Sequence, residues 1–196
     1  RRRRHGTGDA CDLAGSTEMA DGLDPEEFRE ILDQYVEVGM QEVYRYEGIV
    51  ARLMGDGILA VFTGDDESKA CRAALRAEHA MRKKIVALNR ERSLAGKPVT
   101  AVYLGLHVGD VFYGNIGSDT RLDFTVIGPA VNEVSRISAM CRSVSQPVLA
   151  SSEFFRASAS AERSKLISVG RFALRGVERP QELFTLLEQH QVQWEY

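Results

Sequence analysis

The chain has 196 residues, of which 44% are hydrophobic, and a formal net charge of −3. This length favours one domain, or one domain with a small appendage, and the hydrophobic fraction is ample for a buried core. The charge gives no support for a nucleic-acid-binding surface, and no apolar run approaches the ~18 residues of a transmembrane helix.

The N-terminal segment comes first in chain order and is atypical for a strand. Residues 1–8 open with four arginines, and we interpret them as a linker or an end segment. Residues 5–11 contain two glycines and an aspartate, which are unfavourable in a central strand. Two alternatives follow: the segment before Asp12 forms a strand of reduced stability, or it is displaced from the sheet.

Two long helices are predicted in the first half of the chain. The first covers residues 24–46, because Asp24 can cap it, Pro25 suits its first turn and apolar residues then recur at helical spacing. The second covers residues 66–94, which are rich in Ala, Arg, Lys and Leu. Between them, apolar runs on both sides of a Gly-Asp-Gly turn predict a β-hairpin over residues 49–62.

The second half of the chain is dominated by short strand patterns. A third helix is predicted over residues 129–142, where Pro129 suits an early position, and a short helix near residues 152–160. This order of elements predicts an α+β fold in which helices pack on one face of a mainly antiparallel sheet. The predicted strands of this half are residues 99–108, 111–116, 123–127, 147–150, 166–175 and 182–187.

The cysteines do not form a metal-binding or disulfide pattern. Cys11, Cys71 and Cys141 are widely separated, and their number is odd. We therefore expect reduced thiols that serve in packing, in a cytoplasmic protein. His107 lies in a strand pattern, and we interpret it as a packed or hydrogen-bonded core histidine rather than a ligand.

Two aspartates could hold metal ions. Asp12 precedes a small-residue loop, and Asp56 lies at the tip of the predicted hairpin. A two-metal site for phosphoryl transfer needs hard oxygen ligands, and backbone amides at a loop and helix start attract phosphate. Taken alone, each feature has a simpler interpretation, since Gly-Asp-Gly is commonly only a turn and Asp12 could be a turn or cap residue.

Four segments in chain order carry a more specific pattern. Together they resemble the catalytic domain of a class III adenylate/guanylate cyclase of the bacterial type. The resemblance implies a ferredoxin-like, palm-type βααββαβ domain over residues 9–190, followed by a C-terminal tail over residues 191–196. The four segments are residues 12–17 (DLAGST), residues 52–62 (RLMGDGILAVF), residues 105–109 (GLHVG) with 114–117 (GNIG), and residues 123–128 (DFTVIG) leading to Asn132 and Arg136.

The resemblance implies a role for each matching residue. Asp12 and Asp56 would bind two Mg²⁺ or Mn²⁺ ions per active site, with the Leu13 carbonyl as a further ligand. Asn132 would orient the ribose, and Arg136 would steady the charge that builds on the α-phosphate. The residues implied in phosphate binding are Leu13, Ala14, Gly15, Ser16 and Thr17 through their backbone amides, with Arg175 as a weaker candidate.

The implied reaction is the conversion of ATP to 3′,5′-cyclic AMP and pyrophosphate by attack of the ribose 3′-oxygen on the α-phosphate. In such domains the metal ligands come from one subunit and the Asn and Arg from the other, so we expect a head-to-tail homodimer with two equivalent sites. We also expect a fused regulatory domain in a longer parent protein, which could carry a membrane tether outside this segment.

The base-reading positions depart from the pattern of adenylate cyclases, which place Lys and Asp where this chain has Arg52 and Pro129. Arg52 keeps a positive donor, but proline has neither a side-chain acceptor nor an N–H. ATP is favoured over GTP because the positive member of the pair survives.

Other functions stay open at this point. One is a guanylate cyclase or a cyclase of relaxed specificity, and another is a catalytically weak regulatory module that binds nucleotide or dimerises. A diguanylate cyclase is disfavoured because its Gly-Gly-Asp/Glu-Glu-Phe signature is missing.

Overall fold

The computed structural model describes residues 2–14, 23–54, 57–64, 66–118, 121–174 and 180–190; for residues 2–14, 54, 113–118, 121–125 and 189–190 it describes the backbone alone. Its helices are α2 (Pro25–Arg45), α3 (Glu67–Leu94), α4 (Pro129–Val144), α5 (Ser152–Ala157), α6 (Ser160–Arg163) and α7 (Leu187–His190). Its strands are β1 (Arg2–Ala14), β2 (Ile49–Met54), β3 (Gly57–Thr63), β4 (Ala101–Ser118), β5 (Arg121–Ile127), β6 (Val148–Ser151), β7 (Leu166–Phe172) and β8 (Gln181–Leu186).

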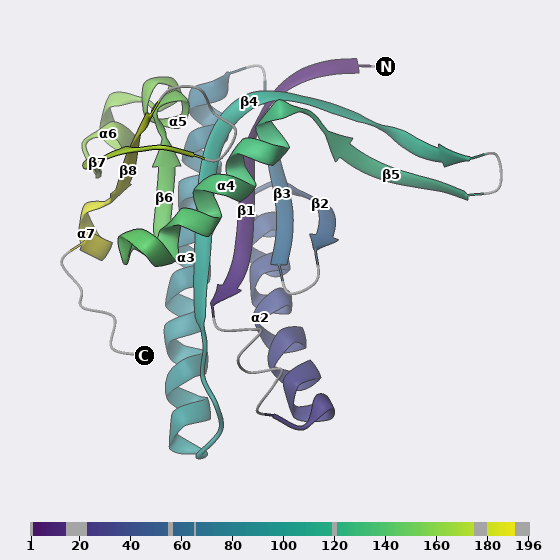
Figure 1. Ribbon diagram of the computed structural model, residues 1–196, viewed down its shortest axis with the longest axis vertical. Helices are drawn as coiled ribbons and strands as arrows, with labels where there is room; N and C mark the ends of the chain where they lie inside the picture. The colour runs from purple at the N-terminus through teal and green to yellow at the C-terminus, as the bar shows by residue number, and fades with distance from the viewer. Residues whose placement is uncertain are drawn as a thin grey trace.

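One mixed sheet organises the described part of the chain (Figure 1). Its strand order is β2-β3-β1-β4-β6-β8-β7, with β5 paired to β4 beside this path. The β4–β6 pair is parallel, whereas the other pairs are antiparallel. The predicted α+β class with a mainly antiparallel sheet is therefore confirmed.

The unusual N-terminal segment forms a central strand rather than lying outside the sheet. β1 lies between β3 and β4, and residues 2–8, which the sequence suggested to be a linker or an end segment, pair within it. Gly6 is opposite Thr63 on one side and Gly109 on the other. Glycine lowers intrinsic strand stability, but pairing on both edges satisfies the backbone N–H and C=O groups without any side chain.

Helices cover both faces of the sheet, which corrects the prediction that they pack on one face. Consecutive residues Ile58–Phe62 of β3 are buried, and they divide between two core clusters. Even-numbered Ile58, Ala60 and Phe62 belong to the cluster beneath α2 and α3, whereas Leu59 and Val61 pack toward α4. The sequence contains this signal, because a strand buried on both faces is apolar at successive positions rather than at alternate ones.

Glycines in β4 bring α4 close to the sheet. A Cβ atom at Gly105 would lie 2.6 Å from the carbonyl oxygen of Val134, so only glycine fits under the helix here. A Cβ at Gly109 would lie 2.8 Å from the Cβ of Ala130. Two positions four residues apart on β4 therefore fix how α4 crosses the sheet.

The two long helices begin as the sequence predicts. The carboxylate of Asp24 accepts a hydrogen bond of 2.9 Å from the backbone N–H of Glu26, and Asp66 accepts one of the same length from Ser68. Both aspartates satisfy N–H groups that a helix start leaves without an intrahelical partner. α2 and α3 then bury Ile31, Tyr35 and Met81 against the sheet.

β4 and β5 extend beyond the body of the molecule as a two-stranded arm (Figure 1). The sequence suggested separate strands at residues 99–108 and 111–116, but β4 is continuous over 18 residues. Gly109 and Asp110 do not interrupt it, because they pair with Gly6 and His5 of β1.

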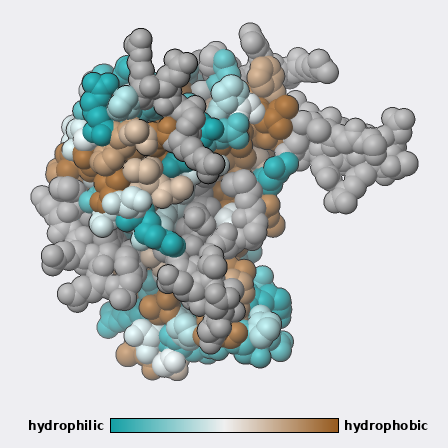
Figure 2. Space-filling model, in the orientation of Figure 1, coloured by the Kyte–Doolittle hydropathy of each residue, from teal (hydrophilic) through white to brown (hydrophobic). Residues whose placement is uncertain are grey.

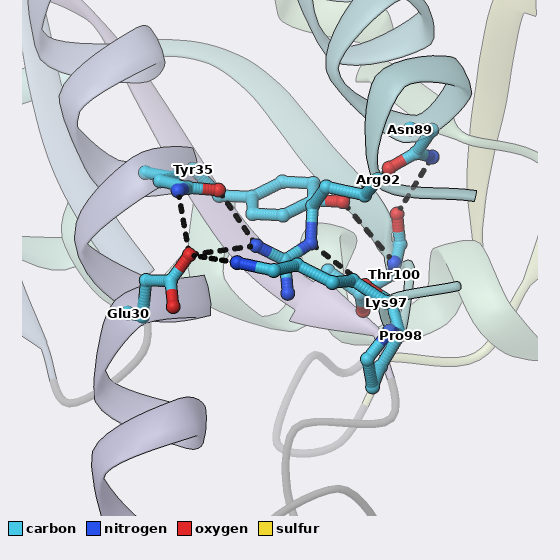
Figure 3. Close-up of polar contacts among 8 residues, drawn as sticks. Glu30, Tyr35, Asn89, Arg92, Lys97, Pro98 and Thr100 are labelled. Atoms are coloured by element: carbon cyan, nitrogen blue, oxygen red, sulfur yellow. Dashed lines mark hydrogen bonds and ion pairs between the residues drawn. The ribbon is translucent and has the colours of Figure 1, made fainter. Parts of the chain in front are cut away.

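A polar network joins α2 and α3 to the start of β4 (Figure 3). The side chain of Arg92 donates to the carbonyl oxygen of Pro98 at 2.7 Å and lies 3.6 Å from the carboxylate of Glu30. The hydroxyl of Tyr35 donates to Asn89 and accepts a 3.3 Å bond from the backbone N–H of Thr100. Residues far apart in sequence thus hold this end of the two helices together.

Cys71 and Cys141 are buried in the core as thiols, as expected for cysteines that serve in packing. The side chain of Cys11 lies outside the described part. Among the described residues, no helix is both long enough and apolar enough to cross a bilayer.

Candidate active site

The first half of the predicted site lies where β1 ends beside the start of β3. Cys11 is paired with Ile58 of β3, and Asp12 is paired with Tyr103 of β4. One step further along the antiparallel register, Asp12 is level with Gly57, the residue that follows Asp56 in the chain. Since neighbouring strands are about 4.8 Å apart, the backbone at Asp12 lies one strand spacing from the residue next to Asp56.

That proximity fits a site in which two carboxylates bridge a pair of cations. Residues 55 and 56 lie outside the described part, as do the predicted phosphate-binding residues Gly15, Ser16 and Thr17. Leu13 and Ala14 are described by their backbone, which pairs with Val102 and Ala101 at the end of β1. Arg175, the weaker candidate, also lies outside the described residues.

Arg52 lies on β2, the strand at the edge of the sheet. It pairs with Leu59 just after a register shift between Val50 and Arg52. Its side chain is exposed, whereas that of the preceding Ala51 is buried against the α4 side of the sheet. The irregularity therefore leaves a positive side chain free to meet a ligand near the hairpin.

The second half of the predicted site lies on α4. Gly128 precedes the helix with φ of 150°, and a Cβ there would lie 2.7 Å from the carbonyl oxygen of Asp110. Pro129 follows as the first helical residue, where its missing N–H leaves no helical bond unmade. The turn that leads into α4 thus depends on a glycine and a proline, and the Pro129 ring is exposed.

Asn132 and Arg136 are one helical turn apart and lie on the same side of α4. Asn132 is exposed and Arg136 is half-buried. The opposite side of the helix, which includes Val134, Ile137 and Cys141, is buried on the sheet. The two polar side chains can therefore meet a ligand or another subunit without disturbing the core.

One chain does not bring the two halves of the predicted site together. Glu133, the neighbour of Asn132, has its carboxylate 3.6 Å from Nε2 of His107. His107 is four residues along β4 from Tyr103, the partner of Asp12, which corresponds to about 13 Å. Asp12 and Asn132 therefore belong to separate regions of the same chain.

His107 is a packed, hydrogen-bonded core histidine, as the sequence predicts. It is 3% exposed, and its Nδ1 is 2.9 Å from the hydroxyl of Ser151. Burial lowers the pKa of His107, against the opposing effect of the carboxylates of Glu133 and Glu153. Among the described residues, these three side chains form the one group with metal-ligating atoms close enough to share an ion.

Sequence reasoning did not identify Glu133 and Glu153, which the fold brings to His107 from α4 and α5. The motif that contains Asn132 also contains Glu133, but its partners lie far away in sequence. A search for carboxylates facing a buried histidine requires the topology.

The chain is similar to known proteins in sequence and in fold. No family model matches the chain. A relative from Anabaena cylindrica named adenylate cyclase is 35% identical over 136 residues; the match covers 67% of this chain, which spans only 26% of that relative's length. The crystal structure of the adenylyl cyclase CyaB from P. aeruginosa has a TM-score of 0.82 at 26% identity, covering 99% of this chain and 96% of that one. The crystal structure of the guanylyl cyclase Cya2 has a TM-score of 0.80 at 26% identity, covering 94% and 92%.

Proposed function

We propose that this chain, which belongs to the class III adenylyl and guanylyl cyclase catalytic domains, converts ATP in preference to GTP into the 3′,5′-cyclic nucleotide and pyrophosphate. The observation that carries the proposal is the β1–β3 register, whose last pair is Cys11 with Ile58, so that Asp12 and Asp56 come one and two residues beyond it on neighbouring segments. We further infer that a head-to-tail homodimer is the active species, because Asn132 and Arg136 lie on a different part of the chain.

Each residue has a distinct task in this mechanism. Asp12 and Asp56 would hold two Mg²⁺ or Mn²⁺ ions, whose positive charge would favour the ionised form of the attacking 3′-hydroxyl and balance the charge of the leaving pyrophosphate. The backbone after Asp12 binds the phosphates, with the Leu13 carbonyl as a further metal ligand. Across the dimer interface, Asn132 orients the ribose and the Arg136 guanidinium stabilises the charge that develops on the α-phosphate.

The decisive experiment is an assay of the purified chain with Mn²⁺ and either ATP or GTP, with the cyclic product measured by chromatography. We expect product from ATP, and a loss of at least about 100-fold in Asp56→Ala and in Arg136→Ala. Asp33→Asn, which removes an exposed carboxylate of α2, is the matched control and should retain full activity. Absence of product from both nucleotides in a folded, dimeric preparation would refute the proposal.

That negative result would favour the second candidate, a regulatory module that binds nucleotide or dimerises without turnover. The specific observation in its favour is Pro129 at the start of α4, which offers the base no side-chain acceptor. Such a module would bind a non-hydrolysable ATP analogue and dimerise, yet form no cyclic product.

A further inference from the structure

We propose that His107, Glu133 and Glu153 form a Zn²⁺ site that is separate from the catalytic metal pair. Their ligand atoms come from β4, α4 and α5 and all lie within 4.8 Å of one another. His107 is opposite Gly8 of β1, four residues or about 13 Å from Asp12, so this cation is not one of the two that Asp12 would hold.

The separation of the first two ligands fits a shared ion better than a direct hydrogen bond. Nε2 of His107 and Oε2 of Glu133 are 3.6 Å apart, which is too long for an N–H···O bond. Two ligands bound to one tetrahedral Zn²⁺ at about 2.0–2.2 Å lie roughly 3.4 Å apart. This pair therefore needs almost no adjustment to admit the ion, and the ligand atom of Glu153 lies within 4.8 Å of both.

Each ligand is also held by a second partner that leaves one ligating atom for the metal. Oε1 of Glu133 accepts a 2.6 Å bond from Gln181, and Oε1 of Glu153 accepts one of 2.6 Å from Arg156. Oε2 of Glu153 is buried and has no hydrogen-bond partner. Outer partners of this kind orient the ligands of metal sites, and they are the reason that this cluster differs from an ordinary group of acids.

The histidine has the surroundings that metal binding requires. Nδ1 faces the Ser151 hydroxyl, so an N–H on Nδ1 leaves the lone pair of Nε2 for the ion. Nε2 lies beside Gly109, where a Cβ atom would be only 2.9 Å away, so this position of the ring depends on a glycine. One imidazole with two carboxylates suits Zn²⁺ better than Mg²⁺, which prefers six oxygen ligands, and water would complete the coordination.

Bound Zn²⁺ would join α4 to β4 and α5. Because Asn132 is the neighbour of Glu133, the ion would hold the start of α4, which carries one half of the proposed active site. The expected consequence is a higher melting temperature of the zinc-loaded chain, by the linkage of binding to folding.

The test is a titration of the metal-free full chain with Zn²⁺ alone, with stoichiometry read by native mass spectrometry and affinity by competition with a zinc-sensitive dye. We expect one Zn²⁺ per chain, a raised melting temperature, and affinity reduced at least about 10-fold in His107→Gln and in Glu153→Gln. Glu153 lies at the surface on a short helix, so its variant should fold even if the buried histidine proves essential for stability.

Two controls locate the ion. His79→Gln removes an exposed histidine whose Nδ1 is 3.7 Å from Glu188, a similar distance. Within the described part of the chain these two residues belong to no group of three ligands, so this variant should bind Zn²⁺ like the parent. The double variant Asp12→Asn, Asp56→Asn should abolish cyclase activity and leave Zn²⁺ binding intact. Failure of the proposed function can therefore be distinguished from failure of the Zn²⁺ proposal. Absence of binding at micromolar Zn²⁺, or equal affinity in Glu153→Gln and His79→Gln, would overturn the proposal.

Discussion

At the scale of single residues, the proposed choice of base rests on two positions that depart from the pattern of adenylate cyclases. Arg52 is exposed on β2 and offers a planar guanidinium where an ammonium is expected. Pro129 is the first residue of α4 and is also exposed, but it offers no polar atom except its carbonyl oxygen. Of the two positions, one therefore keeps a positive side chain and the other has no side-chain acceptor.

Pro129→Asp should sharpen the preference for ATP over GTP. A carboxylate at this position can accept a hydrogen bond from the adenine amino group, whereas it faces the carbonyl oxygen of guanine unfavourably. The first turn of α4 contains no acidic residue, so an aspartate there is compatible with the helix dipole and should not destabilise the fold. The measurement is the ratio of kcat/KM for the two nucleotides, expected to rise about 10-fold.

The matched control is Pro129→Ala, which removes the ring without adding an acceptor. If both variants change the ratio equally, the change reflects the turn and not base recognition. An unchanged ratio in Pro129→Asp would mean that the base is not read at this position.

At the scale of elements, the helices and the hairpin could be predicted because their signals are local. Asp24 and Asp66 cap the helices that they precede. The apolar run Ile58–Phe62 does indicate a strand buried on both faces, but the position of α4 on the second face depends on Gly105 and Gly109, whose partners are distant in sequence. Of the two alternatives for the segment before Asp12, the structure has the strand, and its backbone pairs with β3 and β4, which are distant in sequence.

The candidate site follows the same division between local and distant signals. The ordered motifs predict that α4 and the β1 and β3 segments carry the site, because each motif is continuous in the chain. The group of His107, Glu133 and Glu153 could not be anticipated, since its members are separated by 26 and 20 residues and meet only through the fold.

The network of Figure 3 gives a prediction about stability at the junction of α2, α3 and β4. Tyr35→Phe removes the hydroxyl that donates to Asn89 and accepts from the backbone N–H of Thr100. Because both partners are in the protein interior or at its margin, we expect a loss of about 1–2 kcal/mol in the free energy of unfolding at pH 7. Urea unfolding followed by circular dichroism measures this quantity.

The same variant should reveal an alkaline pH dependence. Burial raises the pKa of Tyr35, although the Thr100 N–H and Arg92 oppose the shift. The folded state then resists ionisation, so stability from this group is present below the ordinary tyrosine pKa of about 10 and declines as the pH rises toward the folded value. The difference in the free energy of unfolding between the parent and Tyr35→Phe should therefore narrow above pH 10. Tyr44→Phe, at an exposed position of α2, should leave the pH dependence of this free energy unchanged.

At the scale of the whole molecule, the distribution of the site over two regions implies assembly. Exposed apolar side chains occur on the edge strand β2, where Ile49 and Leu53 are 42% and 58% exposed, and at Ile127 at the end of β5. Figure 2 shows that apolar residues also gather in the upper part of the face on which α4 lies. Such positions favour a partner surface and agree with the proposed homodimer.

Mixing two inactive variants tests this arrangement directly. In a head-to-tail dimer, Asp56→Ala disables the metal half of a site and Arg136→Ala disables the other half. A mixed dimer of the two variants concentrates both defects in one site and leaves the second site intact. After equal amounts are allowed to exchange subunits, half of the dimers are mixed and half of their sites are whole, so activity should recover to about a quarter of the parent value.

A second mixture makes the result specific to this geometry. In this mixture, chains with Asp12→Asn are combined with chains that carry Asp56→Ala. Both defects lie in the metal half, so every site in every dimer stays defective and no activity should return. Dilution should also reduce the specific activity of the parent once the concentration falls below the dimer dissociation constant, because a monomer holds only separated half-sites. Size-exclusion chromatography of differently tagged chains shows whether the subunits have exchanged. Once they have, recovery of activity in both mixtures, or in neither, would show that the two halves do not meet across a two-fold axis.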